Sequence, residues 1–265
     1  MKSTGLLIAA ALLAALTGVL YWSNHHKTED KPASDAPVAT KLLSFNAPNT
    51  AIGVVTFGQA AIGVRTVSSF LPELEAHLPG HRLSVDEFAK TLSDFFVGQW
   101  KSGMPADYKG PNITFVVGGF DDGQPYGKVF AFDIPAFPVP AERNPGDFGL
   151  TWGGQKDIVD RLIQGFDNGL IDILKTELSL DADKIAELRP KLQALQLPMP
   201  LAFMALQDDV DLALFFVETT IAAQRLTLGL RGCGGPIDVA TITRRDGFRF
   251  IQQKQVKGRE NPSDR

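Results

Sequence analysis

The chain has 265 residues, of which 44% are hydrophobic and 21% are charged, and its formal net charge is −4 at pH 7. A chain of this length and apolar content can bury one large core, so we expect one domain with an appendage rather than two equal domains. The acidic balance argues against nucleic acid as the main partner. The single cysteine, Cys233, excludes an internal disulfide and a thiolate metal cluster.

An apolar segment near the amino terminus predicts contact with a membrane. It runs from Leu6 to Trp22, and as a helix it would span roughly 26 Å, slightly less than the roughly 30 Å hydrocarbon core of a bilayer. It is therefore either a short anchor or the core of a cleaved signal peptide, and both imply export. We favour an anchor comprising residues 1–23. No clean small-x-small cleavage site precedes a polar residue, and Tyr21-Trp22 lies where an interfacial aromatic belt would lie.

Residues 24–45 are rich in charge and proline, which predicts a linker of coil or polyproline II character. The pair His25-His26 in this linker is a weak metal candidate, because no further histidine or cysteine lies nearby. The leader and its charged continuation resemble the anchors of bacterial envelope proteins associated with gliding-motility-type ABC transport systems. That resemblance covers residues 1–45 and implies a membrane-anchored protein with a periplasmic or otherwise extracytoplasmic body.

The predicted body comprises residues 46–257, followed by a disordered tail at 258–265. A short apolar, β-branched run from Ile52 to Phe57 predicts a buried strand, and a helix is expected from about Arg65 to His77. Ser84-Val-Asp-Glu87 forms a capping box, in which the serine and the glutamate satisfy each other's backbone amides. The helix that follows presents aromatic residues at helical spacing, which we interpret as core rather than as a ligand site. These residues are Phe88, Phe95, Phe96 and Trp100.

Two strands are predicted next, Asn112–Gly119 and Gly127–Asp133, joined by a turn after Phe120. Asp121 and Asp122 in this turn could suggest a cation site. An Asp-Gly pair between two alternating runs is first of all turn chemistry, however, so the turn is the preferred interpretation.

The prolines between residues 135 and 145 predict irregular structure. Beyond them we expect a short strand at Phe148–Gln155, a helix whose apolar face runs from Ile158 to Leu174, and a shorter helix at 181–195 that is kinked or broken at Pro190.

The segment 207–228 is apolar on nearly every face, which predicts a helix sandwiched between layers. Its first turn contains Asp208, Asp209 and Asp211. We assign these carboxylates to the positive end of the helix macrodipole rather than to a catalytic cluster.

The closing segment, Leu228–Phe250, predicts a glycine-rich turn, a strand, a hairpin turn at Arg245-Asp-Gly247 and a returning strand. Its string Gly-Gly-Pro-Ile-Asp-Val-Ala-Thr-Ile-Thr, which starts at Gly234, resembles the end of bacterial proteasome-subunit-like proteins of the N-terminal-nucleophile (Ntn) hydrolase superfamily. Three further strings extend the resemblance to residues 52–257. They are Gly53-Val-Val-Thr-Phe-Gly-Gln-Ala-Ala-Ile-Gly, Phe115-Val-Val-Gly-Gly-Phe-Asp and Phe148-Gly-Leu-Thr-Trp-Gly-Gly-Gln.

The element order is typical of an α+β protein. The resemblance refines this fold class to the proteasome-like αββα sandwich of Ntn hydrolases, truncated here at its amino-terminal strands. Peptidases of that superfamily begin with the nucleophile, a freed threonine, and their first strands also supply the aspartate and the lysine that tune it. In this chain the leader and linker occupy that place.

Autolytic exposure of a nucleophile would require glycine before threonine, serine or cysteine. The chain has no Gly-Thr and no Gly-Ser, and its one Gly-Cys is Gly232-Cys233, where cleavage would sever the closing hairpin. Cys233 is therefore interpreted as a small residue in a glycine turn. The sequence predicts no catalytic, cofactor-binding or metal-binding residues, and it leaves enzymatic activity undecided.

Two functional hypotheses remain open. The chain is either a membrane-anchored, proteasome-like subunit without a nucleophile that acts in structure or interaction, or a threonine-type peptidase completed by another chain or by a different gene start. If the gene start is different, the leader is a fusion artefact and the body is cytoplasmic.

We also expect a homo- or hetero-oligomer. A body that begins at Ile52 should leave the strand containing Val54, Val55 and Phe57 open at its edge. That edge could take a strand from a partner, from a second copy, or from the chain's own Lys41–Phe45 segment.

Overall fold

The structure, a computed structural model, describes residues 41–227 and 232–254. The predicted anchor at 1–23, the pair His25-His26 and the tail at 258–265 lie outside the described residues. Within the described ranges, no helix is both long and apolar enough to cross a membrane.

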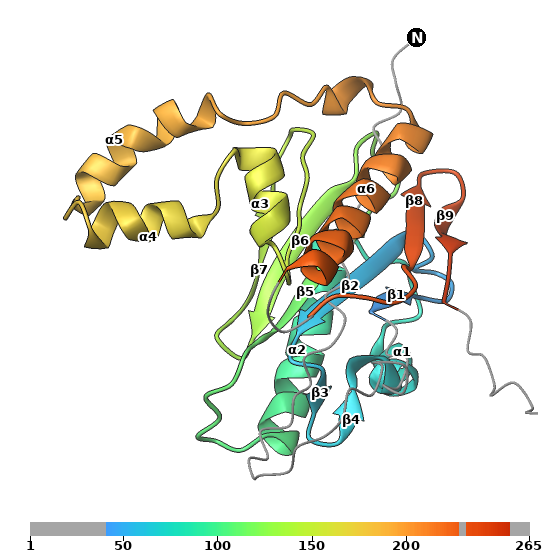
Figure 1. Cartoon of the computed structure of the whole chain (residues 1–265). Helices are drawn as coiled ribbons and strands as arrows, with labels where there is room; N and C mark the ends of the chain where they lie inside the picture. Colours follow the sequence, from blue (N-terminus) through green and yellow to red (C-terminus); the bar gives the residue numbers. More distant parts are fainter. Residues whose placement is uncertain (1–40, 228–231, 255–265) are drawn as a thin grey trace, which may run out of the picture.

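A five-stranded antiparallel sheet lies at the centre of the body (Figure 1), with the spatial order β1-β2-β5-β6-β7. The strands are β1 (Leu42–Ser44), β2 (Ile52–Gly58), β5 (Ile113–Gly119), β6 (Lys128–Ile134) and β7 (Phe137–Arg143). The strands predicted from the runs at 52–57, 112–119 and 127–133 are therefore confirmed.

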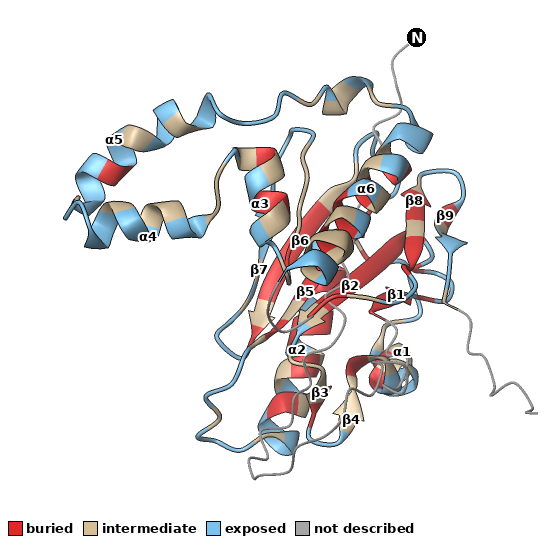
Figure 2. Cartoon of the chain, viewed as in Figure 1, coloured by how far each residue is buried: buried red, intermediate tan, exposed pale blue. Residues whose placement is uncertain are grey.

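The side chains of β2 and β5 alternate between two buried faces. Val54 lies opposite Val117 and Val55 lies opposite Val116, so neighbouring valines on each strand enter different clusters. Val54 and Val117 join the large core, whereas Val55 and Val116 join a smaller cluster on the other face. Figure 2 accordingly shows the central strands as buried. Both faces of the sheet therefore need a covering layer.

Helix α2 (Val85–Gly103) covers one face of the sheet. The predicted capping box is confirmed, since the Ser84 amide donates to Glu87 Oε2 over 3.0 Å. The aromatic stripe is also confirmed as core: Phe88 and Phe96 are fully buried, and the Phe96 ring centroid lies 4.7 Å from that of Phe115 on β5. Helix α1 (Leu71–His77), which follows the 3-10 turn η1 (Val67–Phe70), packs beside α2 in the same core.

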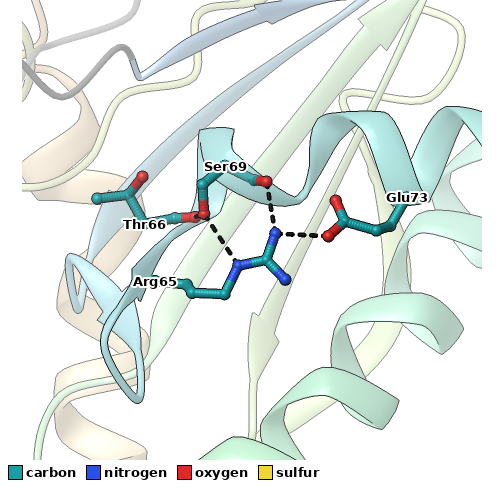
Figure 3. Close-up of polar contacts among 4 residues, drawn as sticks. All are labelled: Arg65, Thr66, Ser69 and Glu73. Atoms are coloured by element: carbon teal, nitrogen blue, oxygen red, sulfur yellow. Dashed lines mark hydrogen bonds and ion pairs between the residues drawn. The ribbon is translucent and has the colours of Figure 1, made fainter.

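The helix expected from Arg65 begins later than predicted, because Arg65–Thr66 form strand β4 and pair with β3 (Ala61–Ile62). Arg65 instead supports the start of the helix from outside (Figure 3). Its guanidinium donates to the Ser69 carbonyl over 2.6 Å and to Glu73 Oε1 over 2.7 Å. The same group lies 3.9 Å from the centroid of the Phe70 ring. The contacts of Arg65 join β4 to the start of α1, so we interpret this cluster as structural.

The prediction of irregular structure after residue 135 is wrong, because Phe137–Arg143 form β7. β7 is an edge strand whose neighbour is β6 alone. Pro138 and Pro140 alternate along it, so both can direct their ring nitrogens to the open side without removing a ladder hydrogen bond. Ser93 of α2 donates a hydrogen bond to the Pro138 carbonyl, which satisfies one acceptor on that side.

Two predictions for the segment between β7 and α5 also fail. Phe148–Gln155 forms no strand, and it is instead a loop in which the Trp152 indole donates to Asp160 Oδ1 over 2.8 Å. The expected helix over 158–174 is two helices, α3 (Asp157–Gln164) and α4 (Asn168–Thr176). Gly165, with φ at +80°, ends α3 in a left-handed conformation.

Helix α5 (Ala182–Gln193) continues through Pro190 rather than breaking there. Pro190 lies in its last turn, and α5 is largely exposed, as is α4 (Figure 2). Helix α6 (Leu206–Leu226) follows the short 3-10 turn η2 (Leu201–Phe203). The prediction that α6 is sandwiched between layers is wrong, since Phe215 and Leu226 on its outer side are exposed.

The closing hairpin is confirmed as β8 (Val239–Thr243) and β9 (Gly247–Gln252). It lies on the second face of the large sheet, where a Cβ added to Gly53 of β2 would lie 2.5 Å from the Phe248 ring. Helices α3 and α6 cover the hairpin in turn, through a cluster that contains Val159, Phe216 and Val239. The described body is thus an α+β protein with the layer order helix, sheet, hairpin, helix.

The boundary of the predicted linker is wrong at its carboxyl end. Leu42–Ser44, within the range assigned to the linker, form β1 and pair with Val55–Gly53 of β2. Leu42 and Leu43 are both buried, on opposite faces of the sheet. The chain's own segment therefore covers the edge of β2, one of the three arrangements expected for it, and β2 is not an open edge.

We predict that Phe115→Ala lowers the free energy of unfolding by about 3–5 kcal/mol, because truncating a fully buried ring leaves a cavity between β5 and α2. The matched control is Phe137→Ala on β7, where the ring is 70% exposed, and we expect a change within about 0.5 kcal/mol there. Urea unfolding followed by circular dichroism measures both. Equal losses in the two variants would contradict this assignment of the core.

Candidate functional site

Lys41 is a buried lysine, and lysine is rarely buried in proteins. It immediately precedes β1, and its carbonyl accepts a hydrogen bond of 2.9 Å from the Thr56 amide of β2, so its backbone is fixed to the sheet. Its side chain is only 8% exposed. The pKa of the Lys41 amine is lowered from 10.5 to about 8, chiefly by burial and also by the charge of Lys254, while Cys233 acts in the opposite direction.

The neighbouring Lys254 differs from Lys41 because it has a matched anion. Its ammonium lies 3.6 Å from Oδ2 of Asp238, and its amide donates to Oδ1 of the same carboxylate over 2.7 Å. Asp238 precedes β8 and Lys254 follows β9, so this pair closes the base of the hairpin. The Lys41 amine lies instead between the charge of Lys254, which disfavours its ionised form, and Cys233, which favours it.

Cys233 is buried in the glycine-rich turn before the hairpin. Next to it, a Cβ added to Gly232 would lie 2.8 Å from Gln155 Nε2, so the loop before α3 reaches this turn. Gln155 Oε1 accepts a hydrogen bond of 3.1 Å from Gln224 of α6. The buried Oε1 atom of Gln224 has no hydrogen-bond partner within the described ranges.

Segments from four parts of the chain therefore meet at one place: the start of β1, the loop before α3, the end of α6 and the base of the hairpin. We call Lys41, Cys233, Asp238 and Lys254 the lysine cluster. A buried amine whose pKa is about 8 can accept a proton near neutral pH, and a thiol beside it is a potential nucleophile. The cluster therefore contains a proton acceptor and a thiol. Cleavage before Cys233 would still separate the hairpin from the body.

The sequence analysis missed Lys41 because it placed this residue in the linker. The available signal was the short apolar run Leu42-Leu-Ser-Phe45 directly after it, which is long enough for an edge strand. Lys254 and Asp238 give no comparable signal, since the hairpin brings them together only in the folded chain.

Asp121 and Asp122, which the sequence analysis considered as a cation site, make contacts within the protein. Asp121 accepts from the Val85 amide over 2.8 Å and pairs with Lys128, while Asp122 pairs with Arg82. The described residues contain no group of three or more histidine, cysteine, aspartate or glutamate side chains that could hold a metal ion.

The three aspartates at the start of α6 separate in the structure. Asp208 accepts from the Ala205 amide at the helix start, and Asp211 accepts from Gln207. Asp209 differs from both, because it lines a cleft that Asp208 and Asp211 do not line.

The chain was compared with family models and with curated proteins, and no match was found in either comparison.

We predict opposite effects for the two lysines of the cluster. At pH 7 the ionised Lys41 amine is buried at a cost, so Lys41→Met should raise the free energy of unfolding by on the order of 1–3 kcal/mol. Lys254→Met should lower it by roughly 3 kcal/mol, because it leaves Asp238 buried without its ion pair.

The pH dependence tests the same assignment. Between pH 8 and 10.5 the unfolded chain binds more protons at Lys41 than the folded chain does, so wild-type stability should rise with pH in this window. The advantage of Lys41→Met should disappear there. Denaturant unfolding at pH 7 and pH 10 measures both quantities, and an advantage that persists unchanged at pH 10 would contradict a lowered pKa.

Proposed function

We propose that this chain is a proteasome-like subunit of the Ntn fold, held at a membrane by its amino-terminal segment, that has no nucleophile of its own and acts in structure or interaction. The observation that carries the proposal is the layer order helix, sheet, hairpin, helix. An αββα sandwich has two stacked sheets between helices. Here five strands form one sheet, while β8 and β9 alone occupy the position of the other among the described residues.

A two-stranded layer is the natural place for a partner to bind. An isolated hairpin is marginally stable in water, whereas three or more strands with an apolar face are stable. The Phe248 amide of β9 donates to the Thr50 carbonyl over 2.7 Å, but within the described ranges no strand other than β8 pairs with β9, and Ile251 is 56% exposed. A strand from a partner or from a second copy that pairs with the hairpin would extend this layer. We therefore place the binding site for a partner strand at the hairpin and not at the edge of β2, because β1 already pairs with β2.

A second candidate function, a threonine-type peptidase completed by another chain, is favoured by one observation, the buried amine of Lys41. The resemblance to Ntn peptidases implies a lysine that tunes the nucleophile. A strand added to the hairpin, with a nucleophile at its own amino terminus, would meet an amine whose pKa is already near 8. In this form the chain supplies the proton acceptor and its partner supplies the attacking hydroxyl.

We predict that Ile251→Lys weakens self-association or partner binding of the full-length protein in detergent. A lysine on an edge strand disfavours the addition of another strand. The matched control is Val64→Lys at the tip of the β3–β4 hairpin, where the valine is fully exposed. Light scattering after size-exclusion chromatography gives the mass of each variant and of any co-purified partner. The proposal fails if the wild-type protein is a monomer without a partner, or if both variants assemble as the wild type does.

We also predict that the full-length protein alone cleaves no fluorogenic peptide and is not labelled by an epoxyketone probe, because the sequence has no Gly-Thr or Gly-Ser at which autolysis could expose a nucleophile and its one Gly-Cys, Gly232-Cys233, precedes the closing hairpin. Labelling mapped to this chain by mass spectrometry would contradict the first candidate function. Cleavage that appears only with a co-purified partner, and that Lys41→Met reduces by about tenfold or more, would establish the second.

A further inference from the structure

A cleft of about 920 Å³ lies between the β5–β6 turn, the loop that follows β7, and the start of α6. No member of the lysine cluster lines this cleft. It is large enough for a ligand of several ring-sized groups, since small-molecule sites commonly enclose about 300–1,000 Å³. Its walls come from segments distant in sequence, which the fold holds at fixed positions.

The walls combine apolar and charged side chains. Tyr126 of the β5–β6 turn and Phe148 of the loop after β7 form an edge-to-face pair with ring centroids 6.0 Å apart. Tyr126 is 59% exposed, so its ring remains accessible to a ligand. Leu150 and Leu201 supply further apolar surface in the same cleft. A ligand with an aromatic or alkyl body can therefore bury that body here.

Part of the charge in the cleft is already neutralised. The Lys128 ammonium lies 2.9 Å from Oδ2 of Asp121, and Arg82 lies 3.1 Å from Oδ1 of Asp122. Asp147 also lines the cleft, and its Oδ1 accepts a hydrogen bond of 2.7 Å from the Phe148 amide. The two ion pairs cancel charge, whereas the hydrogen bond to Asp147 orients that carboxylate and leaves its charge in place.

Glu142 and Asp209 are the carboxylates that remain. Neither makes a hydrogen bond or an ion pair through its side chain to another residue of the described ranges. Burial and, to a smaller extent, the charge of Asp208 together raise the pKa of Asp209 to about 6. A carboxylate whose ionised form is disfavoured in this way gains from a cation placed beside it. Arg143 is the one unmatched cation among the described residues of the wall, so the unmatched charge of the cleft is negative.

We infer that this cleft binds an organic cation with an apolar body, that is, an amine or guanidinium attached to an aromatic or alkyl group. The cationic group would lie against Glu142 and Asp209, and the body would lie against Tyr126, Phe148 and Leu150. The faces of the aromatic rings favour the same charge, because a cation is attracted to the ring quadrupole. The inference does not depend on the proposed function, since the cleft and the lysine cluster share no residue.

The test uses full-length protein in detergent and isothermal titration with three matched probes. These are phenethylamine, the neutral 2-phenylethanol and the anionic 3-phenylpropanoate. We expect phenethylamine to bind about tenfold or more tightly than the alcohol, a difference of about 1.4 kcal/mol, and the anion to bind more weakly than both. A second arm compares acetyl-Phe-Arg-amide with acetyl-Phe-Gln-amide. This arm distinguishes a basic peptide side chain from a free amine as the source of the cation.

Variants locate the binding. Glu142→Gln and Asp209→Asn should each weaken the binding of the cationic probe about fivefold or more while leaving that of 2-phenylethanol unchanged. Tyr126→Ala should weaken both probes, because it removes the apolar contact. Asp211→Asn is the matched control on α6, since Asp211 pairs with Gln207 outside the cleft, and it should have no effect.

The inference is overturned if the amine and the alcohol bind equally, if neither cationic probe binds at millimolar concentration, or if both Glu142→Gln and Asp209→Asn bind phenethylamine as the wild type does. Circular dichroism of each variant reports whether it is folded. Since the two carboxylates lie on different elements, one misfolded variant still leaves the other as a test.

Discussion

Both faces of the five-stranded sheet are buried, and the other layers of the body follow from that constraint. On β2 and β5, neighbouring valines point to opposite sides and enter two different clusters. A strand apolar on both faces is stable only between two layers. Helix α2 is the first layer and the β8–β9 hairpin, seated on Gly53, is the second. The hairpin is apolar on its outer side as well, so α3 and α6 are required to cover it.

The same constraint explains why a lysine is buried at the start of β1. Leu42 and Leu43 lie on opposite faces of the sheet and Phe45 follows in the large core. Burying each of these side chains contributes roughly 1.5–3 kcal/mol. The cost of holding the Lys41 amine near a pKa of about 8 is comparable with one of them. Burial of the three apolar residues therefore outweighs the desolvation of one amine, and the hydrogen bond from the Thr56 amide to the Lys41 carbonyl holds this residue beside β2.

Local signals in the sequence predicted those elements whose stability is local. The capping box at Ser84 and the alternation of β5 are decided within a few residues, and both were found. The failures depend on contacts that a sequence window does not contain. Pro138 and Pro140 are compatible with a strand only because β7 is an edge. Gly165 ends a helix whose apolar periodicity continues beyond it. The lysine cluster forms only when the hairpin folds back beside β1, so neither its members nor the lowered pKa of Lys41 could be inferred from spacing.

The two candidate sites favour ligand groups of opposite charge. This difference determines which kind of partner each site can accept. At the base of the hairpin the Lys41 amine has a lowered pKa, so a strand that brings a carboxylate there would raise that pKa towards its ordinary value and would be stabilised in return. In the cleft, Glu142 and Asp209 make no side-chain hydrogen bond or ion pair with another described residue, and they repel the same carboxylate and attract an amine. A negatively charged group is therefore favoured beside Lys41 and disfavoured in the cleft, and the reverse holds for a positively charged group. A partner strand paired with the hairpin and a cation in the cleft would therefore bind the body at the same time, because they occupy different sites.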